Sequence, residues 1–133
     1  MKLKHLLLVD DDPTTNFFNQ HLIGKMNIFS EIHVAENGQM ALERIEQLQK
    51  RGEAPDMILL DINMPIMNGF EFLDHYQKLN DQVKSSVVVC MLTTSLAKED
   101  LERSKEYNVL SDYIDKPLYE AKMRELILKY FGE

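Results

Sequence analysis

The sequence predicts one doubly wound α/β domain, in which helices cover both faces of a five-stranded parallel sheet and form three α/β/α layers. Short apolar runs alternate with helical segments along the chain. Four of these runs are apolar at nearly every position, which is typical of parallel strands buried on both faces. The length of 133 residues fits one domain, since a domain usually holds about 100 to 200 residues.

Strands are predicted where the apolar runs lie. The first four runs are continuous, and the fifth is a weaker signal just before a Lys-Pro pair. The predicted strands are His5–Val9, Ile32–Ala35, Met57–Leu60, Val87–Leu92 and Tyr113–Ile114.

Five helices are predicted between and after the strands, mostly from apolar residues spaced along one face. Asp12 and Pro13 favour a helix start, because a short acidic side chain caps free amides and proline suits the first turn. The predicted helices are Pro13–Met26, Gly38–Arg51, Gly69–Leu79, Ala97–Tyr107 and Tyr119–Phe131. Right-handed crossovers between these elements are compatible with the flavodoxin-like strand order 2-1-3-4-5.

Composition argues against several classes of function. Lys and Arg number 15 against 22 Asp and Glu, and the net charge of −7 has the wrong sign for direct nucleic-acid binding. No run approaches the roughly 18 apolar residues of a membrane span, so membrane insertion is not expected. The apolar stretch near the N-terminus is too short for a signal peptide. The single cysteine, Cys90, allows no internal disulfide, which predicts a cytoplasmic protein.

Polar residues follow four of the predicted strands. In such a sheet the ligand binds beyond the carboxyl ends of the strands, where the strand order reverses. The first and third strands are neighbours in this order, so the acids that follow them should lie close together. Carboxylates that lie close together repel one another unless a cation intervenes, and a site made of oxygen ligands alone suits Mg²⁺. One acid after a strand is usually only a helix cap, and Asp12 fits that role. The strand-end residues that predict a site together are Asp10, Asp11, Asp61, Thr93 and Lys116.

Four segments at the strand ends resemble the receiver domains of two-component response regulators, similar to chemotaxis response regulators. The segments are LLLVDDDP (6–13), ILLDINMPIMNG (58–69), MLTTS (91–95) and DYIDKPL (112–118). Each is weak evidence alone, but the four in this order are specific, and the resemblance covers the whole chain. It implies a receiver domain over residues 1–133, and because this length leaves no room for a separate output domain we expect the receiver to act alone.

The resemblance implies that Asp61 accepts a phosphoryl group from a sensor histidine kinase or a histidine phosphotransfer protein. A carboxylate can attack phosphorus held by a histidine, which forms an aspartyl phosphate. The resemblance also implies a Mg²⁺ site in which Asp11 binds the ion directly and Asp10 assists through water. Asp61 and the backbone carbonyl of Asn63 would complete the protein ligands.

The remaining polar positions are assigned by the resemblance to charge stabilisation and signal output. Lys116 and Thr93 would contact the phosphoryl oxygens. Tyr113 would turn inward when Thr93 moves, which would change a protein-binding face over roughly residues 95–131.

Three further positions bear on the loops around the site. Gly69 is expected to take a positive φ after the phosphoacceptor, since glycine does so freely. The Lys116–Pro117 bond resembles a pair that is commonly cis in the family. Thr94 departs from the family pattern, because many receivers carry a small residue there.

Two other classes of function are alternatives. Small phosphohydrolases also use a Mg²⁺-assisted Asp nucleophile, but they place a second Asp where this chain has Asn63. A flavin-binding protein of the same fold needs neutral or basic amides after the first strand, where this chain has the acidic DDDPTT. We therefore expect a signalling domain and not an enzyme for outside substrates. The sequence leaves its downstream protein target and homodimer formation open.

The four histidines, His5, His21, His33 and His75, are scattered without metal-ligand spacing. We expect structural roles for them. The charged segment 96–107 is predicted to be a solvated helix, and its part in a partner-binding face stays open.

Overall fold

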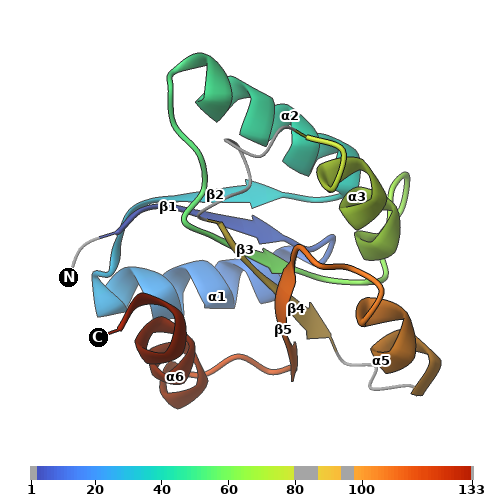
Figure 1. Ribbon diagram of the computed structural model, residues 1–133. Coiled ribbons are helices and arrows are strands. Elements are labelled where there is room, and N and C mark those ends of the chain that lie inside the picture. The colour runs from blue at the N-terminus through green and yellow to red at the C-terminus, as the bar shows by residue number, and fades with distance from the viewer. Residues whose placement is uncertain (1–2, 80–86, 94–97, 133) are drawn as a thin grey trace.

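The computed structural model describes residues 3–79, 87–93 and 98–132, apart from the side chains of Thr93 and Lys98. Five strands form one sheet in the predicted order β2-β1-β3-β4-β5. Every neighbouring pair is parallel, so the carboxyl ends of the strands share one edge (Figure 1). The strands are β1 (Leu3–Val9), β2 (Phe29–Ala35), β3 (Met57–Leu60), β4 (Val88–Thr93) and β5 (Leu110–Asp115).

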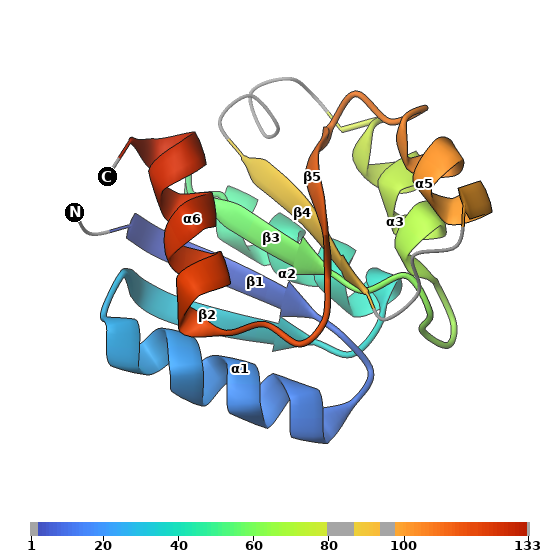
Figure 2. The ribbon, with the colours of Figure 1, turned by 90° about the horizontal axis from the view of Figure 1, so that it is seen from below.

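Helices cover both faces of the sheet, which confirms the predicted three layers. The described helices are α1 (Pro13–Met26), α2 (Gly38–Lys50), α3 (Gly69–Tyr76), α5 (Lys98–Ser104) and α6 (Glu120–Phe131). α1 and α6 lie on one face, and α2, α3 and α5 lie on the other (Figures 1 and 2).

The fifth strand is longer than its sequence signal. The structure extends it to Leu110–Asp115, whereas the sequence predicted only Tyr113–Ile114. Ser111 and Asp112 interrupt the apolar pattern, and β5 tolerates them because it is an edge strand that is only partly buried.

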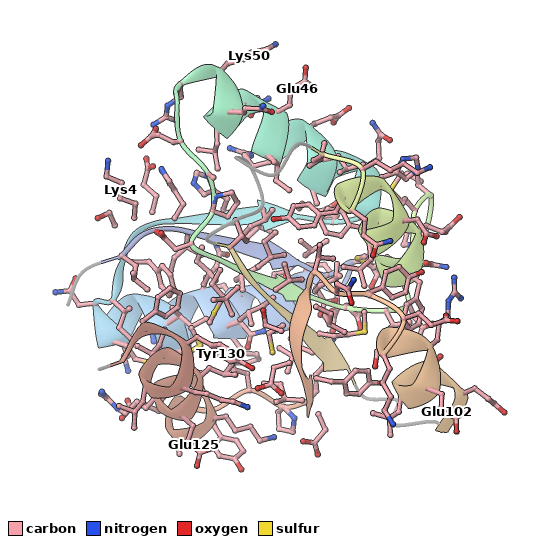
Figure 3. The ribbon with its side chains drawn as sticks, in the orientation of Figure 1. Lys4, Glu46, Lys50, Glu102, Glu125 and Tyr130 are labelled. Atoms are coloured by element: carbon pink, nitrogen blue, oxygen red, sulfur yellow. The ribbon has the colours of Figure 1, made fainter. Side chains whose placement is uncertain are left out.

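Alternate residues of each central strand pack into two separate cores. In β1, Leu7 and Val9 join the core on the α2 and α3 face, and Leu6 and Leu8 join the core on the α1 and α6 face. Charged side chains lie outside these cores, as Glu46 and Lys50 do on the outer side of α2 (Figure 3). With both faces covered, the carboxyl edge of the sheet is where polar side chains can gather.

Cys90 is fully buried in β4, which agrees with its place in an apolar run. Burial raises the pKa of its thiol to about 12, so the thiol stays protonated at neutral pH. Within the ranges that the structure describes, every helix is too short or too polar to span a membrane.

Gly69 is required for a different reason from the one expected. Its φ is not in the positive range, and in the loop between β3 and α3 the positive φ falls on Ile66 at 67°. A Cβ atom at Gly69 would lie 2.4 Å from the backbone oxygen of Asp61 and 3.0 Å from the Cα of Ile62. The expectation of a positive φ was wrong. Glycine is needed because the start of α3 packs directly against the backbone after β3.

Candidate functional site

The carboxyl edge of the sheet brings the predicted acids together. Asp10 follows β1 and Asp61 follows β3, and they are only 6% and 9% exposed. The Asp61 backbone N–H donates to the carbonyl of Val9 at 2.9 Å, which places the start of the loop after β3 beside the end of β1. Asp11 is exposed beside them. One carboxylate oxygen from each of the three residues lies within 4.8 Å of the other two.

Lys116 reaches this acidic cluster from the end of β5. Its Nζ lies 2.5 Å from Oδ2 of Asp10 and 3.7 Å from Oδ2 of Asp61. Its side chain is only 14% exposed. The Lys116–Pro117 bond is cis, as the family resemblance implied. One lysine charge therefore faces two buried carboxylates.

Local hydrogen bonds at the start of α1 hold Asp10 and separate its role from that of Asp12. Asp10 Oδ1 accepts from the backbone N–H of Asp12 at 3.0 Å, and the Asn16 side-chain amide donates to the Asp10 carbonyl at 2.8 Å. Asp12 caps the helix by accepting from the Thr14 N–H at 3.1 Å and the Thr15 hydroxyl at 2.7 Å. These bonds lower the pKa of Asp12, the Thr15 hydroxyl most strongly. The predicted cap is confirmed.

Burial raises the pKa of Asp61 to about 6. The Lys116 charge opposes this shift, and the nearby Asp10 and Asp11 carboxylates add to it. The Ile62 N–H, which donates to Asp61 Oδ1 at 2.9 Å, favours the ionised form. One lysine does not neutralise the negative charge that converges here.

The donor set fits a hard divalent cation. Carboxylate oxygens are the ligands that Mg²⁺ prefers, and Mg²⁺ keeps several waters when few protein groups bind it. The exposure of Asp11 leaves room for such waters. A small cavity beside the acids is lined by Asp10, Asp61 and Asn16, among others. The Asn16 Oδ1 atom is buried without a hydrogen-bond partner among the described residues, and a water in this cavity would satisfy it.

The other predicted site residues are less closely tied to the acids. Asn63 is exposed two residues after Asp61, and the role of its carbonyl as a metal ligand stays a prediction. Thr93 ends β4, but its side chain and all of Thr94 lie outside the described residues. Tyr113 pairs with Met91 in the sheet and packs, partly buried, against the core on the α2 and α3 face.

The structure also brings together residues that the sequence interpretation treated as unrelated. His5 in β1 and His33 in β2 lie with their ring nitrogens 3.0 Å apart, and Glu31 joins them. The description of these histidines as scattered was wrong. Strand pairing creates the contact, and the alternation of Glu31 and His33 on one face of β2 was the only sequence signal.

Comparison with known proteins agrees with this geometry. The sequence profile of the response regulator receiver domain matches residues 6–128. The chain belongs to this receiver family. A solved structure, the two component response regulator from Cytophaga hutchinsonii, is similar with a TM-score of 0.89 and 31% identity, over 100% of both chains.

In two relatives the segment similar to this chain is part of a longer protein. The chain is 34% identical over 131 residues to the nitrate/nitrite response regulator protein NarL of Escherichia coli (strain K12), covering 92% of the chain and 56% of NarL. It is 28% identical over 127 residues to the sensor protein GacS of Pseudomonas syringae pv. syringae, covering 96% of the chain and 13% of GacS. The receiver thus spans about half the length of NarL and a small part of GacS.

Replacing Asp61 by Asn is expected to stabilise the metal-free receiver at neutral pH. Below pH 4 the carboxyl is protonated in both folded and unfolded chains, so its ionisation costs nothing. Between pH 4 and about 6 the unfolded chain ionises first, and the wild type progressively loses stability. Above pH 6 the Asn variant should be more stable by roughly 1–3 kcal/mol.

Urea unfolding in EDTA across this pH range measures the difference. Glu46→Gln, which removes an exposed carboxylate on α2, is the control and should show no comparable pH-dependent gain. An Asp61→Asn advantage that is constant from pH 4 to 7 would contradict the raised pKa.

Proposed function

We propose that this receiver accepts a phosphoryl group on Asp61 from a sensor histidine kinase or a histidine phosphotransfer protein, in a Mg²⁺-dependent reaction. The observation that carries the proposal is the convergence around Asp61. One carboxylate oxygen each from Asp10 and Asp11 lies within 4.8 Å of an Asp61 oxygen, and the Lys116 Nζ lies 3.7 Å from Asp61 Oδ2. The receiver family, with relatives named as a response regulator and a sensor protein, supports a partner that carries phosphohistidine.

In the proposed reaction an Asp61 oxygen attacks the phosphorus of the phosphohistidine. The phosphorus–nitrogen bond breaks, the imidazole leaves with the bonding pair, and the phosphoryl group stays on Asp61. Mg²⁺, held directly by Asp11, Asp61 and the Asn63 carbonyl and through water by Asp10, would supply positive charge for the transferring oxygens. Lys116 already lies between two carboxylates, so acceptor oxygens on Asp61 would fall within reach of its ammonium group.

Asn63 supports a signalling role over turnover of outside substrates. The competing phosphohydrolase mechanism needs an acid at this position, and a neutral amide cannot carry its proton. We therefore propose that the chain is not an enzyme beyond its own phosphorylation and dephosphorylation. Stand-alone action and a cytoplasmic location stay predictions from the sequence.

We further propose that phosphorylation changes a protein-binding face built from α5, β5 and α6. Tyr113 lies on β5 three residues before Lys116, and the two flank the end of that strand. A phosphoryl group adds about −1.5 to −2 charge, which would give Lys116 and Thr93 an interaction that the unphosphorylated receiver lacks. That differential interaction is what can shift Tyr113 and its neighbours toward a second arrangement.

Asp61 should be the only residue phosphorylated by acetyl phosphate in Mg²⁺. Asp10 lies beside the same lysine, but its Oδ1 accepts from the Asp12 N–H and its Oδ2 lies 2.5 Å from Lys116, whereas Asp61 Oδ2 lies 3.7 Å from Lys116. Intact-mass measurement should show one phosphoryl adduct on the wild type, and none on Asp61→Asn or in EDTA. Asp74→Asn, which alters an exposed acid on α3, is the control and should keep the adduct. An undiminished adduct on Asp61→Asn would overturn the assignment.

A protein donor is expected to use the groove beside Lys116. This groove has a volume of about 490 Å³, and its lining includes Phe18, Pro117 and Leu118 as well as Lys116. Phe18→Ala should slow phosphotransfer from a phosphorylated histidine donor roughly 10-fold or more, because exposed aromatic side chains commonly anchor interfaces. Phosphorylation by acetyl phosphate should not change.

Phe17→Ala is the matched control for Phe18→Ala. Phe17 is equally exposed, but it stacks on His21 and is not among the residues that line the groove. Equal slowing by both substitutions, or no slowing by Phe18→Ala, would refute docking at this groove.

The proposed output change should appear in NMR spectra of the receiver with a beryllofluoride mimic in Mg²⁺. Amide shifts are expected around Asp61 and also along β5 and α5. Tyr113→Ala should keep the shifts near Asp61 and lose those of α5, because the ring is the proposed link between them. Wild-type shifts confined to the neighbours of Asp61 would contradict the route through Tyr113.

A further inference from the structure

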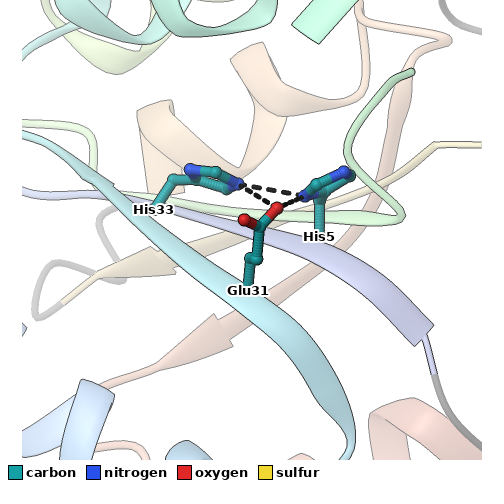
Figure 4. Close-up of side chains that lie close together, drawn as sticks. All are labelled: His5, Glu31 and His33. Atoms are coloured by element: carbon teal, nitrogen blue, oxygen red, sulfur yellow. Dashed lines mark hydrogen bonds and ion pairs between the residues drawn. The ribbon is translucent and has the colours of Figure 1, made fainter. Parts of the chain in front are cut away.

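His5, Glu31 and His33 converge on the face of the sheet that α2 and α3 cover (Figure 4). His5 Nδ1 lies 3.0 Å from His33 Nε2 and 3.0 Å from Glu31 Oε2, and the remaining pair is 3.9 Å apart. Parallel pairing of β1 with β2 sets His5 opposite Glu31 and Leu7 opposite His33. Three atoms with lone pairs therefore meet at one place on two rigid strands.

The spacing of these three atoms matches a small metal ion. A circle through points with these separations has a radius of about 2.0 Å, and zinc lies about 2.0–2.2 Å from nitrogen and carboxylate ligands. Tetrahedral ligands of zinc lie about 3.3–3.4 Å apart, so shifts of well under about 1 Å, chiefly of the exposed Glu31 side chain, would seat the ion without a change in strand register.

A second carboxylate orients His5 for such a role. The Nε2 atom of His5 lies 3.1 Å from Glu53 Oε2, in the loop between α2 and β3. When Nε2–H donates to Glu53, the lone pair of Nδ1 faces His33 and Glu31. Histidines that bind metals commonly donate their other ring N–H to a carboxylate, which fixes the ring and its tautomer.

We propose that His5, Glu31 and His33 bind a transition-metal dication, with Zn²⁺ as the preferred ion and water at the remaining position. Two imidazoles and one carboxylate suit zinc, whereas Mg²⁺ prefers oxygen ligands alone. Zn²⁺ would thus bind at the cluster of His5, Glu31 and His33, and Mg²⁺ at the acidic cluster on the carboxyl edge.

The surroundings of the cluster are compatible with metal binding. The His5 side chain is 3% exposed and that of His33 11%, whereas Glu31 is 51% exposed on the edge strand β2 and leaves a route for the ion. Burial lowers the pKa of His33, with smaller contributions from His5 and Arg44, and this favours the neutral ring that a metal needs. Arg51 pairs with Glu53 at 2.8 Å and not with Glu31.

The bound ion would join β1 to the edge strand β2, and through Glu53 to the loop before β3. His5 in β1 lies five residues before Asp10, which follows the strand, and this is roughly 16 Å along an extended chain. Zinc would therefore stabilise the sheet at a distance from the phosphoacceptor, by binding the folded chain in preference to the unfolded one.

The test is calorimetric titration of the metal-stripped receiver with Zn²⁺ in excess Mg²⁺, which would occupy the proposed Mg²⁺ site at the carboxyl edge. One Zn²⁺ per chain is expected, together with a rise in Tm. His33→Gln and Glu31→Gln should each weaken binding more than about 10-fold, and Glu53→Gln about 10- to 100-fold. Glu31 is exposed, so its substitution tests the site even if a change at buried His5 prevents folding.

His75→Gln, an exposed histidine on α3, is the control and should bind Zn²⁺ as the wild type does. Cu²⁺ in place of Zn²⁺ should give an electron paramagnetic resonance signal with splitting from two nitrogens, reduced to one in His33→Gln. Zinc binding that survives in His33→Gln but disappears in Asp61→Asn would place the ion at the carboxyl edge and overturn the proposal. Absence of saturable binding by the wild type would also overturn it.

Discussion

Two buried carboxylates that share one lysine are the constraint on which the rest of this receiver depends. Asp10 and Asp61 directly follow neighbouring strands, and among the described residues only Lys116 brings an opposite charge into contact with both. A buried charge is costly unless it is paired, so the folded chain is left with excess negative charge at one edge. Burial is the main cause of the raised pKa of Asp61, and the neighbouring carboxylates of Asp10 and Asp11 add to it. The same excess makes the site receptive to a cation.

The strands and loops around the site hold these charged side chains close together. The central strands are buried on both faces mostly by apolar side chains, so Asp10 and Asp61 can be acidic because they directly follow the ends of β1 and β3. Asp12 is engaged as the cap of α1, and Gly69 lets α3 approach the backbone of Asp61. The cis bond before Pro117 lies next to the lysine that completes the cluster. The loops after the strands thus place the mutually repelling carboxylates next to one another and bring the attracting lysine into contact with two of them.

β1 contributes a residue to both the acidic cluster at the carboxyl edge and the proposed zinc cluster. Asp10 follows its carboxyl end, while His5 lies near its start, on the face that contains Leu7 and Val9. The two groups of ligands differ in chemistry, since one offers oxygens alone and the other adds two imidazoles. A strand held in the centre of the sheet can support both because its backbone hydrogen bonds are made on both sides.

The sequence by itself determined the order of elements and the acids of the site. Continuous apolar runs specify buried parallel strands wherever they occur, and residues directly after such strands must meet at one edge, as Asp10, Asp11 and Asp61 do. The full length of β5 was beyond this reasoning, because an edge strand needs little burial and therefore leaves a weak pattern.

Tertiary structure alone decided which distant side chains touch. The closer contact of Lys116 with Asp10 than with Asp61 depends on the path of the chain after β5. The steric need for Gly69 depends on how α3 meets the backbone after β3. The meeting of His5 with His33 depends on the register between β1 and β2, which no local spacing encodes. Such contacts form between residues far apart in sequence, and their distances are fixed only when the sheet assembles.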